Sequence, residues 1–415
     1  MRNRKIISAL FLVAITFTSC KYGRFVVYNF ADIKDYKKFP AVAVEKGDYT
    51  FSYATGPDSL DEKINSIKIT NSKGKKFLLD EYLDEETKTV AFMVIRNDSV
   101  LYDRYFEKYH DESIVTSFSV AKSFVSALVG IAIQEGFIKS VQEPITNYLP
   151  ELAEANEKFS AITIENALNM RTGIKFNESS YANPFSEIAA LYYGRNHFKL
   201  LKNSKFQGEP GSEYEYQSIN TEILGLIVES ATGKQLAAYF EEKLWQPLGM
   251  EYSGSWNIDS KKHQAPKAYC CINGVAKDFA KFGSLYLKDG YWNGSSIVNQ
   301  DWVRKSTTFT PQNDGYQYQW YCDPEILRED GKTKYFEDSL SATKAVPELA
   351  EFWVQKSSRY SGKWYVTMPN SSFMAIGILG QLIYVDRSKN LVMVRFGKKN
   401  DSNYSYIFRS IGSVL

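Results

Sequence analysis

Ser119 and Lys122, three residues apart, are the pair in this chain whose types and spacing best suit nucleophilic catalysis. Residues at positions i and i+3 of a helix share one face, so the hydroxyl and the amine can meet. A serine in the first turn also has an unpaired backbone N–H and the positive end of the helix dipole beside it. A buried lysine loses its ammonium form more readily and can take the hydroxyl proton. The pattern therefore predicts acyl transfer on Ser119.

The same spacing occurs again at Ser72 and Lys75, so the pattern alone is weak evidence. Ser72 lies in a polar turn rich in glycine and lysine. Ser119, in contrast, begins residues 119–134, a segment that is apolar almost all round and must be buried. Gly136 is placed to end that helix. The alternative is structural: Ser119 only caps the helix, and the Lys122 amine reaches solvent along its own stem.

Tyr216 is the third candidate, in a tyrosine-rich extended segment that follows Pro210-Gly211 and leads into a helix at Thr221. Beside a lysine, a tyrosine has its phenolate favoured and can act as a general base. Ser218 alternates with Tyr216 and can point from the same side of an extended segment. The alternative for Tyr216 is a loop tyrosine packed on neighbouring helices.

Glycines open a strand predicted over residues 376–385. A glycine in a strand usually marks the close approach of a ligand or of another backbone. If this strand lies beside Ser119, one of its backbone N–H groups and that of Ser119 would form an oxyanion hole. Tight packing of the sheet explains the glycines equally well.

Several other chemistries are disfavoured by composition. The three histidines lie in polar stretches predicted to be on the surface, and no Gly-x-Ser-x-Gly motif is suitably placed, so a Ser-His-Asp triad has little support. Lys and Arg number 50 against 48 Asp and Glu, which gives no reason to expect nucleic acid as a partner. Cysteine and histidine spacing suggests no zinc site, and acyl transfer on a serine needs no metal or cofactor.

Cysteines carry two further expectations. Cys20 follows three basic residues in positions 1–5, an apolar run at 6–17 and the small pair Thr18-Ser19. Residues 1–20 are similar to a bacterial lipoprotein signal. We therefore expect an exported protein that is lipidated at Cys20 and lies on the periplasmic side or the cell surface. The alternatives are a plain signal peptide and an uncleaved anchor. Cys322 could pair with Cys270 or Cys271, or all three could be free buried thiols.

The elements that must position the candidate residues follow from periodicity and turn signals. A hairpin is predicted at residues 91–102 around Asn97-Asp98. Helices at 162–170, 185–193, 222–232 and 235–244 predict a helical lobe over about 141–264. A helix at 276–287, a strand at 391–396 and a closing helix at 403–411 complete the body. Strands near both ends of the chain imply one antiparallel sheet that joins them.

Residues 21–90 are interpreted as an N-terminal extension, residues 91–415 as the main domain, and about 322–368 as a polar, irregular insertion.

Together, these segments resemble the serine β-lactamase and penicillin-binding-protein superfamily, in its class C-like branch. The resemblance runs from about 94 to 397 and is closest to 6-aminohexanoate-dimer (nylon-oligomer) hydrolase and esterase-type members. The matching segments are residues 117–124, 148–152, 162–164, 170–174 and 245–250. The resemblance implies an α/β (α+β) fold of the β-lactamase/DD-peptidase type, with an antiparallel sheet flanked by helices plus an all-helical lobe.

By the same resemblance, Ser119 is the acylated nucleophile, Lys122 the base or proton relay, and Tyr216 the tyrosine of the second motif. Ser218 stands where class C enzymes usually have asparagine and is assigned to substrate binding. Ala375-Ile376-Gly377 falls on the third motif, so Gly377 would contact substrate and Ile378 would supply the second oxyanion N–H. Tyr193 and Trp320 are expected in the substrate wall, with core packing as the alternative.

Ala375 departs from the family pattern, which usually has lysine or histidine there to bind a substrate carboxylate. This departure disfavours β-lactamase and D-Ala-D-Ala carboxypeptidase activity. The sequence therefore predicts a serine hydrolase that acts on a small amide, ester or peptide-like molecule. The alternatives are a penicillin-recognising enzyme and a non-catalytic binding or sensor protein of the cell envelope.

Overall fold

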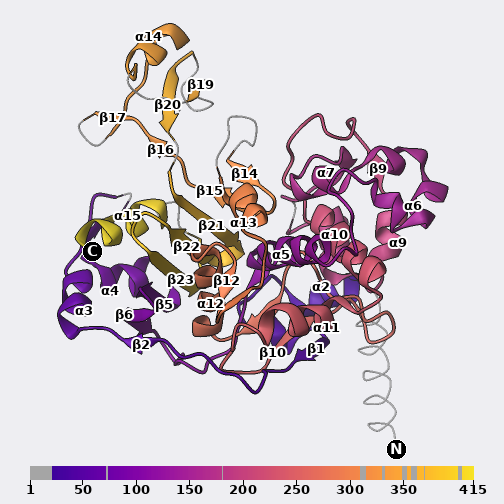
Figure 1. Cartoon of the computed structure of the whole chain (residues 1–415), viewed down its shortest axis with the longest axis horizontal. Helices are drawn as coiled ribbons and strands as arrows, with labels where there is room; N and C mark the ends of the chain where they lie inside the picture. The colour runs from indigo at the N-terminus through magenta and orange to yellow at the C-terminus, as the bar shows by residue number, and fades with distance from the viewer. Residues whose placement is uncertain are drawn as a thin grey trace, which may run out of the picture.

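A computed structural model of the chain describes residues 21–71, 73–179, 181–308, 315–329, 332–347, 353–356, 362–368, 370–400 and 404–415. Figure 1 shows a large sheet on one side, a helical lobe on the other, and helix α5 running between them. The mixed α/β architecture confirms the predicted fold class. Cys20 and the signal-like segment before it lie outside the described residues, as does Ser72. None of the described helices is both long and apolar enough to cross a membrane.

The large sheet has eight strands, and strands from both ends of the chain meet in it as predicted. β5 pairs antiparallel with β23, and β6 follows β5 in a hairpin. Only β2 at the edge runs parallel to its neighbour, β6. In order across the sheet, the strands are β14 (Tyr316–Gln317), β15 (Trp320–Cys322), β21 (Ser372–Gly377), β22 (Gln381–Asp386), β23 (Leu391–Gly397), β5 (Thr89–Arg96), β6 (Ser99–Tyr105) and β2 (Ala54–Thr55).

The predicted hairpin turn is present, but the strand predicted at 376–385 is wrong in one respect. Asn97 and Asp98 both have positive φ, 53° and 56°, which matches the twist of a two-residue hairpin. The later segment forms two antiparallel strands, β21 and β22, separated by a tight turn at Ile378–Gly380. Leu379 and Gly380 reverse the chain with φ of 64° and 76°. The apolar residues on both sides concealed this turn, whose local signals were Gly377 and Gly380.

Two layers of helices cover the two faces of the sheet. α12 (Ala276–Leu287), at the predicted residues, packs on β22 and β23. Alternate side chains of β23 point to opposite faces: Val392 and Val394 join the core under α12, whereas Leu391 and Met393 join the core under α15 (Tyr404–Val414). α15 extends past the closing helix that the sequence predicted.

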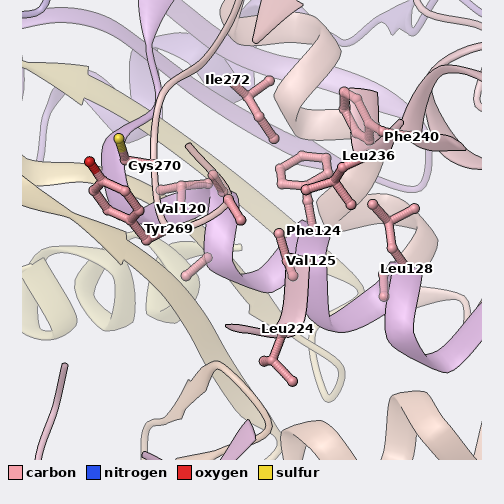
Figure 2. Close-up of a cluster of buried hydrophobic side chains, with 14 of the residues drawn as sticks. Val120, Phe124, Val125, Leu128, Leu224, Leu236, Phe240, Tyr269, Cys270 and Ile272 are labelled. Atoms are coloured by element: carbon pink, nitrogen blue, oxygen red, sulfur yellow. The ribbon is translucent and has the colours of Figure 1, made fainter. Parts of the chain in front are cut away.

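α5 (Ala121–Gln134) is the central helix, and it is buried from Ala121 to Ala132 as its all-round apolar pattern predicted. Figure 2 shows Phe124 and Leu128 of α5 among Leu236 and Phe240 of the helical lobe. Phe124 also stacks on Phe282 of α12, with ring centroids 3.7 Å apart. α5 therefore ties the lobe to the sheet.

The helical lobe contains α6 (Pro150–Ala155), α7 (Ile164–Leu168), α8 (Glu187–Tyr193), α9 (His197–Lys202), α10 (Ser218–Thr232) and α11 (Leu236–Phe240). α10, which packs on α5, begins earlier than predicted, so Ser218 is its first residue. A second, four-stranded sheet is separate from the large one. Its strands, in order, are β1 (Ala41–Val44), β10 (Gly254–Asn257), β11 (Ile272–Gly274) and β7 (Val115–Thr116). β7 leads directly to Ser119.

Three other expectations need correction. The described residues within 322–368 are not irregular: β16 (Glu325–Ile326), β20 (Trp364–Met368) and β19 (Trp353–Lys356) form a small sheet that packs with α14 (Ser339–Lys344) and projects from the body in Figure 1. Cys270 and Cys271 are joined to each other in a disulfide, and Cys322 is a free buried thiol. His197 is buried, because its Nδ1 is paired with Glu222 Oε1 at 2.7 Å.

Candidate active site

Ser119 lies where β7, β11 and β21 converge at the start of α5. The Ser117 N–H donates to the Ile272 carbonyl at 2.8 Å, which fixes the segment before the serine. Phe118, immediately before it, has φ of 46°, a conformation that a bulky residue adopts only when its surroundings impose it. Ser119 itself remains half-buried and borders a cavity. The backbone is therefore bent so that the hydroxyl faces open space.

Lys122 lies one turn further along α5, and its amine is buried against the serine. Its Nζ lies 3.0 Å from Ser119 Oγ, 3.1 Å from Ser218 Oγ and 2.9 Å from the Tyr269 carbonyl oxygen. The side chain is only 2% exposed, so the alternative in which Lys122 reaches solvent is wrong. Burial lowers the pKa of Lys122 to about 8, although the nearby Glu178 carboxylate opposes this change.

The contacts of Lys122 determine where its lone pair points when the amine is neutral. The Tyr269 carbonyl can only accept a hydrogen bond. The Ser218 hydroxyl donates to Glu178 Oε1 at 2.7 Å, so its oxygen also accepts from Lys122. Two N–H groups of the neutral amine are thereby occupied, and the lone pair is directed at Ser119 Oγ. This geometry suits removal of the serine proton.

Tyr216 reaches Ser119 from the extended segment before α10. Its hydroxyl interacts with the Ser119 side chain, and its ring lies against Tyr316 and Tyr321, with centroids 5.8 and 6.2 Å away. Lys122 Nζ is 5.1 Å from the ring centroid. Burial raises the pKa of Tyr216 well above its ordinary value. The phenolate expected from the sequence is therefore disfavoured, and the protonated Tyr216 hydroxyl could donate a proton in this site.

Glu178 is a site residue that the sequence analysis did not single out. It lies in the loop after β8 (Ile174–Lys175) and accepts the Ser218 N–H at 2.8 Å as well as the Ser218 hydroxyl. Its only sequence signal was its place in a polar stretch after the segment at 170–174. Ser218, assigned to substrate binding from the sequence, is 2% exposed and instead contacts Lys122 and Glu178.

The end of β21 lies against the backbone of the serine. A Cβ added to Gly377 would stand 2.7 Å from the Ser117 carbonyl oxygen and 3.1 Å from the Ser119 nitrogen. Only glycine leaves room for this approach, as its position in the sequence suggested. Ile378 follows at the turn and borders the same cavity as Ser119. The two N–H groups expected to form an oxyanion hole therefore belong to residues that share one pocket.

The cavity beside Ser119 has a volume of about 340 Å³. It is mostly aromatic and aliphatic. Among the described residues that line it, none has a charged side chain: they are Ser119, Tyr181, Tyr216, Tyr321, Met374, Ile376, Gly377, Ile378, Gly380, Leu382, Asn400, Tyr404 and Ser405. This surface suits an uncharged acyl group.

Trp320 and Tyr193 do not lie in this cavity, so both predictions of a substrate-wall role are wrong. Trp320 is fully buried and packs against Tyr286 and Phe373, with centroids 4.4 and 5.2 Å away. The Tyr193 hydroxyl donates to the Asn29 carbonyl at 2.5 Å, and the side chain is buried under the N-terminal segment. Both side chains are packed in the core, which was the alternative for each.

Comparison with known proteins gives concordant results. The family model described as beta-lactamase matches residues 78–410. The 6-aminohexanoate-dimer hydrolase of Paenarthrobacter ureafaciens is 27% identical over 333 residues, which cover 76% of this chain and 74% of that protein. A solved structure named "Putative 6-aminohexanoate-dimer hydrolase from Bacillus anthracis" has a TM-score of 0.71 at 21% identity and covers 94% of this chain and 92% of its own. A class C beta-lactamase has a TM-score of 0.59 at 14% identity, covering 88% of this chain and 99% of its own.

Proposed function

We propose, from the premise that this chain belongs to the beta-lactamase family of serine hydrolases, that it cleaves a small amide or ester through an acyl-enzyme on Ser119. One observation carries the proposal: the buried Lys122 amine lies 3.0 Å from Ser119 Oγ, at a serine that borders a cavity. Burial disfavours the charged form of a lysine, and a neutral lysine amine beside a serine hydroxyl can act as the base that activates it.

In the proposed mechanism, neutral Lys122 takes the proton of Ser119 as Oγ bonds to the carbonyl carbon of the substrate. The N–H groups of Ser119 and Ile378 hold the oxyanion. Tyr216 gives its proton to the leaving amine or alcohol and regains one from Lys122. Water then attacks the carbonyl carbon of the acyl-enzyme while neutral Lys122 takes one of its protons. Lys122 returns that proton to Ser119 Oγ as the bond between Oγ and the acyl carbon breaks and the acid leaves.

The cavity, whose described lining residues carry no charged side chain, supports a neutral acyl group as substrate. Ala375 stands where relatives that bind a substrate carboxylate usually have a cation, and it is buried. The similarity to 6-aminohexanoate-dimer hydrolase supports an amide or ester substrate over a β-lactam. We therefore expect labelling by a fluorescent penicillin to be absent or weak.

A fluorophosphonate probe tests the nucleophile. We expect the wild type to be labelled and Ser119→Ala to be unlabelled. Ser123→Ala is the matched control, because Ser123 is a buried serine on the same helix whose hydroxyl donates to the Gln319 carbonyl at 2.8 Å. It should be labelled like the wild type. A correctly folded wild type that resists the probe would assign the chain to the non-catalytic binding proteins of this fold.

A substrate panel then separates the reaction classes. p-Nitrophenyl esters, short linear amides and D-amino-acid amides should be compared by kcat/KM. Turnover of neutral esters or linear amides supports the proposal. Turnover confined to D-amino-acid peptides or penicillins would favour the penicillin-recognising alternative.

We also propose that the chain is exported and lipidated at Cys20, on the basis of residues 1–20. Incorporation of an alkyne fatty acid in a bacterial host should label the wild type but not Cys20→Ser. Labelling of both variants, or of neither, would refute the lipid anchor.

A further inference from the structure

An exposed apolar surface surrounds the described start of the chain. Helix α2 (Lys21–Tyr28) carries Tyr22, Val26 and Val27, and Phe30 follows it. Val26 is 69% exposed, and Phe185, from the loop before α8, is 74% exposed. The rings of Tyr22 and Phe185 are in contact, with centroids 5.2 Å apart. These five side chains are named the N-terminal apolar face.

The opposite side of α2 is docked firmly on the body. Arg24 donates to the Gly194 and Asp259 carbonyls at 3.1 and 2.9 Å, and it is buried. Phe25 packs edge-on against Tyr193, with centroids 5.1 Å apart. The Tyr193 hydroxyl holds the Asn29 carbonyl just after the helix. These contacts fix the orientation of α2, so that the N-terminal apolar face points toward solvent. Five large apolar side chains clustered on a surface mark an interaction site.

We propose that the N-terminal apolar face lies on a lipid bilayer. The described part of α2 follows Cys20 directly, and the preceding sequence has basic residues in 1–5 and an apolar run at 6–17. Either a lipid on Cys20 or an uncleaved anchor brings Lys21 to the membrane surface. Apolar and aromatic side chains on a helix lying along the interface insert among the lipid headgroups. Lys21, whose Nζ lies 4.9 Å from the Tyr22 ring centroid, suits the edge of such a contact.

The same face is connected to the candidate active site through one loop. Tyr181 lines the cavity beside Ser119, and Glu178 holds Ser218. Phe185 lies on the bilayer-facing side only four positions after Tyr181. A bilayer under Phe185 would therefore support one wall of the cavity and present it to molecules in or near the membrane. This link to catalysis rests on the proposed hydrolase activity, whereas the bilayer contact rests only on the proposed membrane anchor at the N-terminus.

Lipid quenching of a site-specific label tests the contact in the full-length, lipidated chain. An environment-sensitive fluorophore is attached to Val26→Cys, and the chain is reconstituted into phosphatidylcholine vesicles with or without doxyl-labelled lipid. Leu340→Cys is the control, because Leu340 is 61% exposed on α14, at the far side of the molecule in Figure 1. The unsubstituted chain gives the background from native cysteines.

We expect doxyl lipid to quench the label at position 26 severalfold more than the label at position 340. Equal quenching at the two positions, in vesicles that retain the protein, would overturn the proposal. Cross-linking of two Val26→Cys chains without lipid quenching would assign the face to a second copy and overturn it as well.

Turnover of an ester dissolved in the vesicles tests the link to the cavity. The double variant Val26→Ser, Val27→Ser leaves the loop and the site intact. We expect its kcat/KM on the vesicle-borne ester to fall about tenfold, because two apolar side chains that contact lipid are replaced by polar ones. Its kcat/KM on a water-soluble ester should not change. An equal fall on both esters, or on neither, would refute the link; a chain inactive on all esters would refute the proposed function while the quenching result still stands.

Discussion

Glu178 accepts two hydrogen bonds from Ser218, one from its backbone N–H at 2.8 Å and one from its hydroxyl at 2.7 Å. The proton of the Ser218 hydroxyl is thereby committed to the carboxylate, and its oxygen faces Lys122 Nζ at 3.1 Å. Glu178 consequently does two things: it orients the base and favours its ammonium form. Burial opposes the second effect and is the larger of the two, since the pKa of Lys122 falls to about 8.

The pKa of Lys122 predicts the pH dependence of catalysis. Only the neutral amine can accept the Ser119 proton, so activity should be lost as pH falls through about 8. We expect kcat/KM for a neutral p-nitrophenyl ester to rise about tenfold per pH unit below that value and to level off above it. Ser119→Ala supplies the correction for spontaneous hydrolysis. A profile that is flat from about pH 6 to 9 would exclude Lys122 as the base.

Replacing Glu178 should move the same limb of the profile. Glu178→Gln removes the charge that favours the Lys122 ammonium and keeps an oxygen that can accept from Ser218. We therefore expect the acidic limb, where activity rises with pH, to shift to lower pH, with a plateau reduced by less than about tenfold. Glu154→Gln, at an exposed glutamate of α6, is the control and should leave the profile unchanged. A shift to higher pH, or none, would contradict the assigned role of Glu178.

Elements with dense local patterns were predictable from the sequence. The all-round apolar run at 119–134 required a buried helix, and Asn97-Asp98 required a tight hairpin turn. Ser119 and Lys122 were predicted to lie together because i and i+3 positions of a helix always share a face. Tyr216 could be placed beside them only through the resemblance to a known family.

Long-range polar contacts were not predictable. Glu178 contacts Ser218 from 40 residues away, and a glutamate in a polar loop carries no periodic signal. The sequence also does not show whether a given aromatic or histidine side chain is buried. Trp320 and His197 lie in the core because they contact residues distant in sequence. The Ile378–Gly380 turn was missed because strand propensity continues across it.

Phe124 should be a principal stabilising residue of the core between lobe and sheet. It is fully buried, stacks on Phe282 and meets Phe240 edge-on. Phe124→Ala removes these contacts and leaves a cavity, so we expect the free energy of unfolding to fall by about 3–5 kcal/mol. Chemical denaturation followed by circular dichroism measures it. Phe137→Ala, at a ring that is 44% exposed, should change stability by less than about 0.5 kcal/mol, and equal effects of the two substitutions would contradict this account of the core.

Gly377 should be required for turnover because a side chain there cannot fit beside the nucleophile. In Gly377→Ala the new Cβ would stand 2.7 Å from the Ser117 carbonyl oxygen, so β21 and the Ile378 N–H must move away from Ser119. We expect kcat to fall about a hundredfold with KM little changed, because the oxyanion donors act on the transition state. Gly208→Ala is the control: its Cβ would meet nothing closer than 3.7 Å, and kcat should be retained. With thermal unfolding matched between the variants, an unchanged kcat in Gly377→Ala would remove β21 from the proposed oxyanion hole.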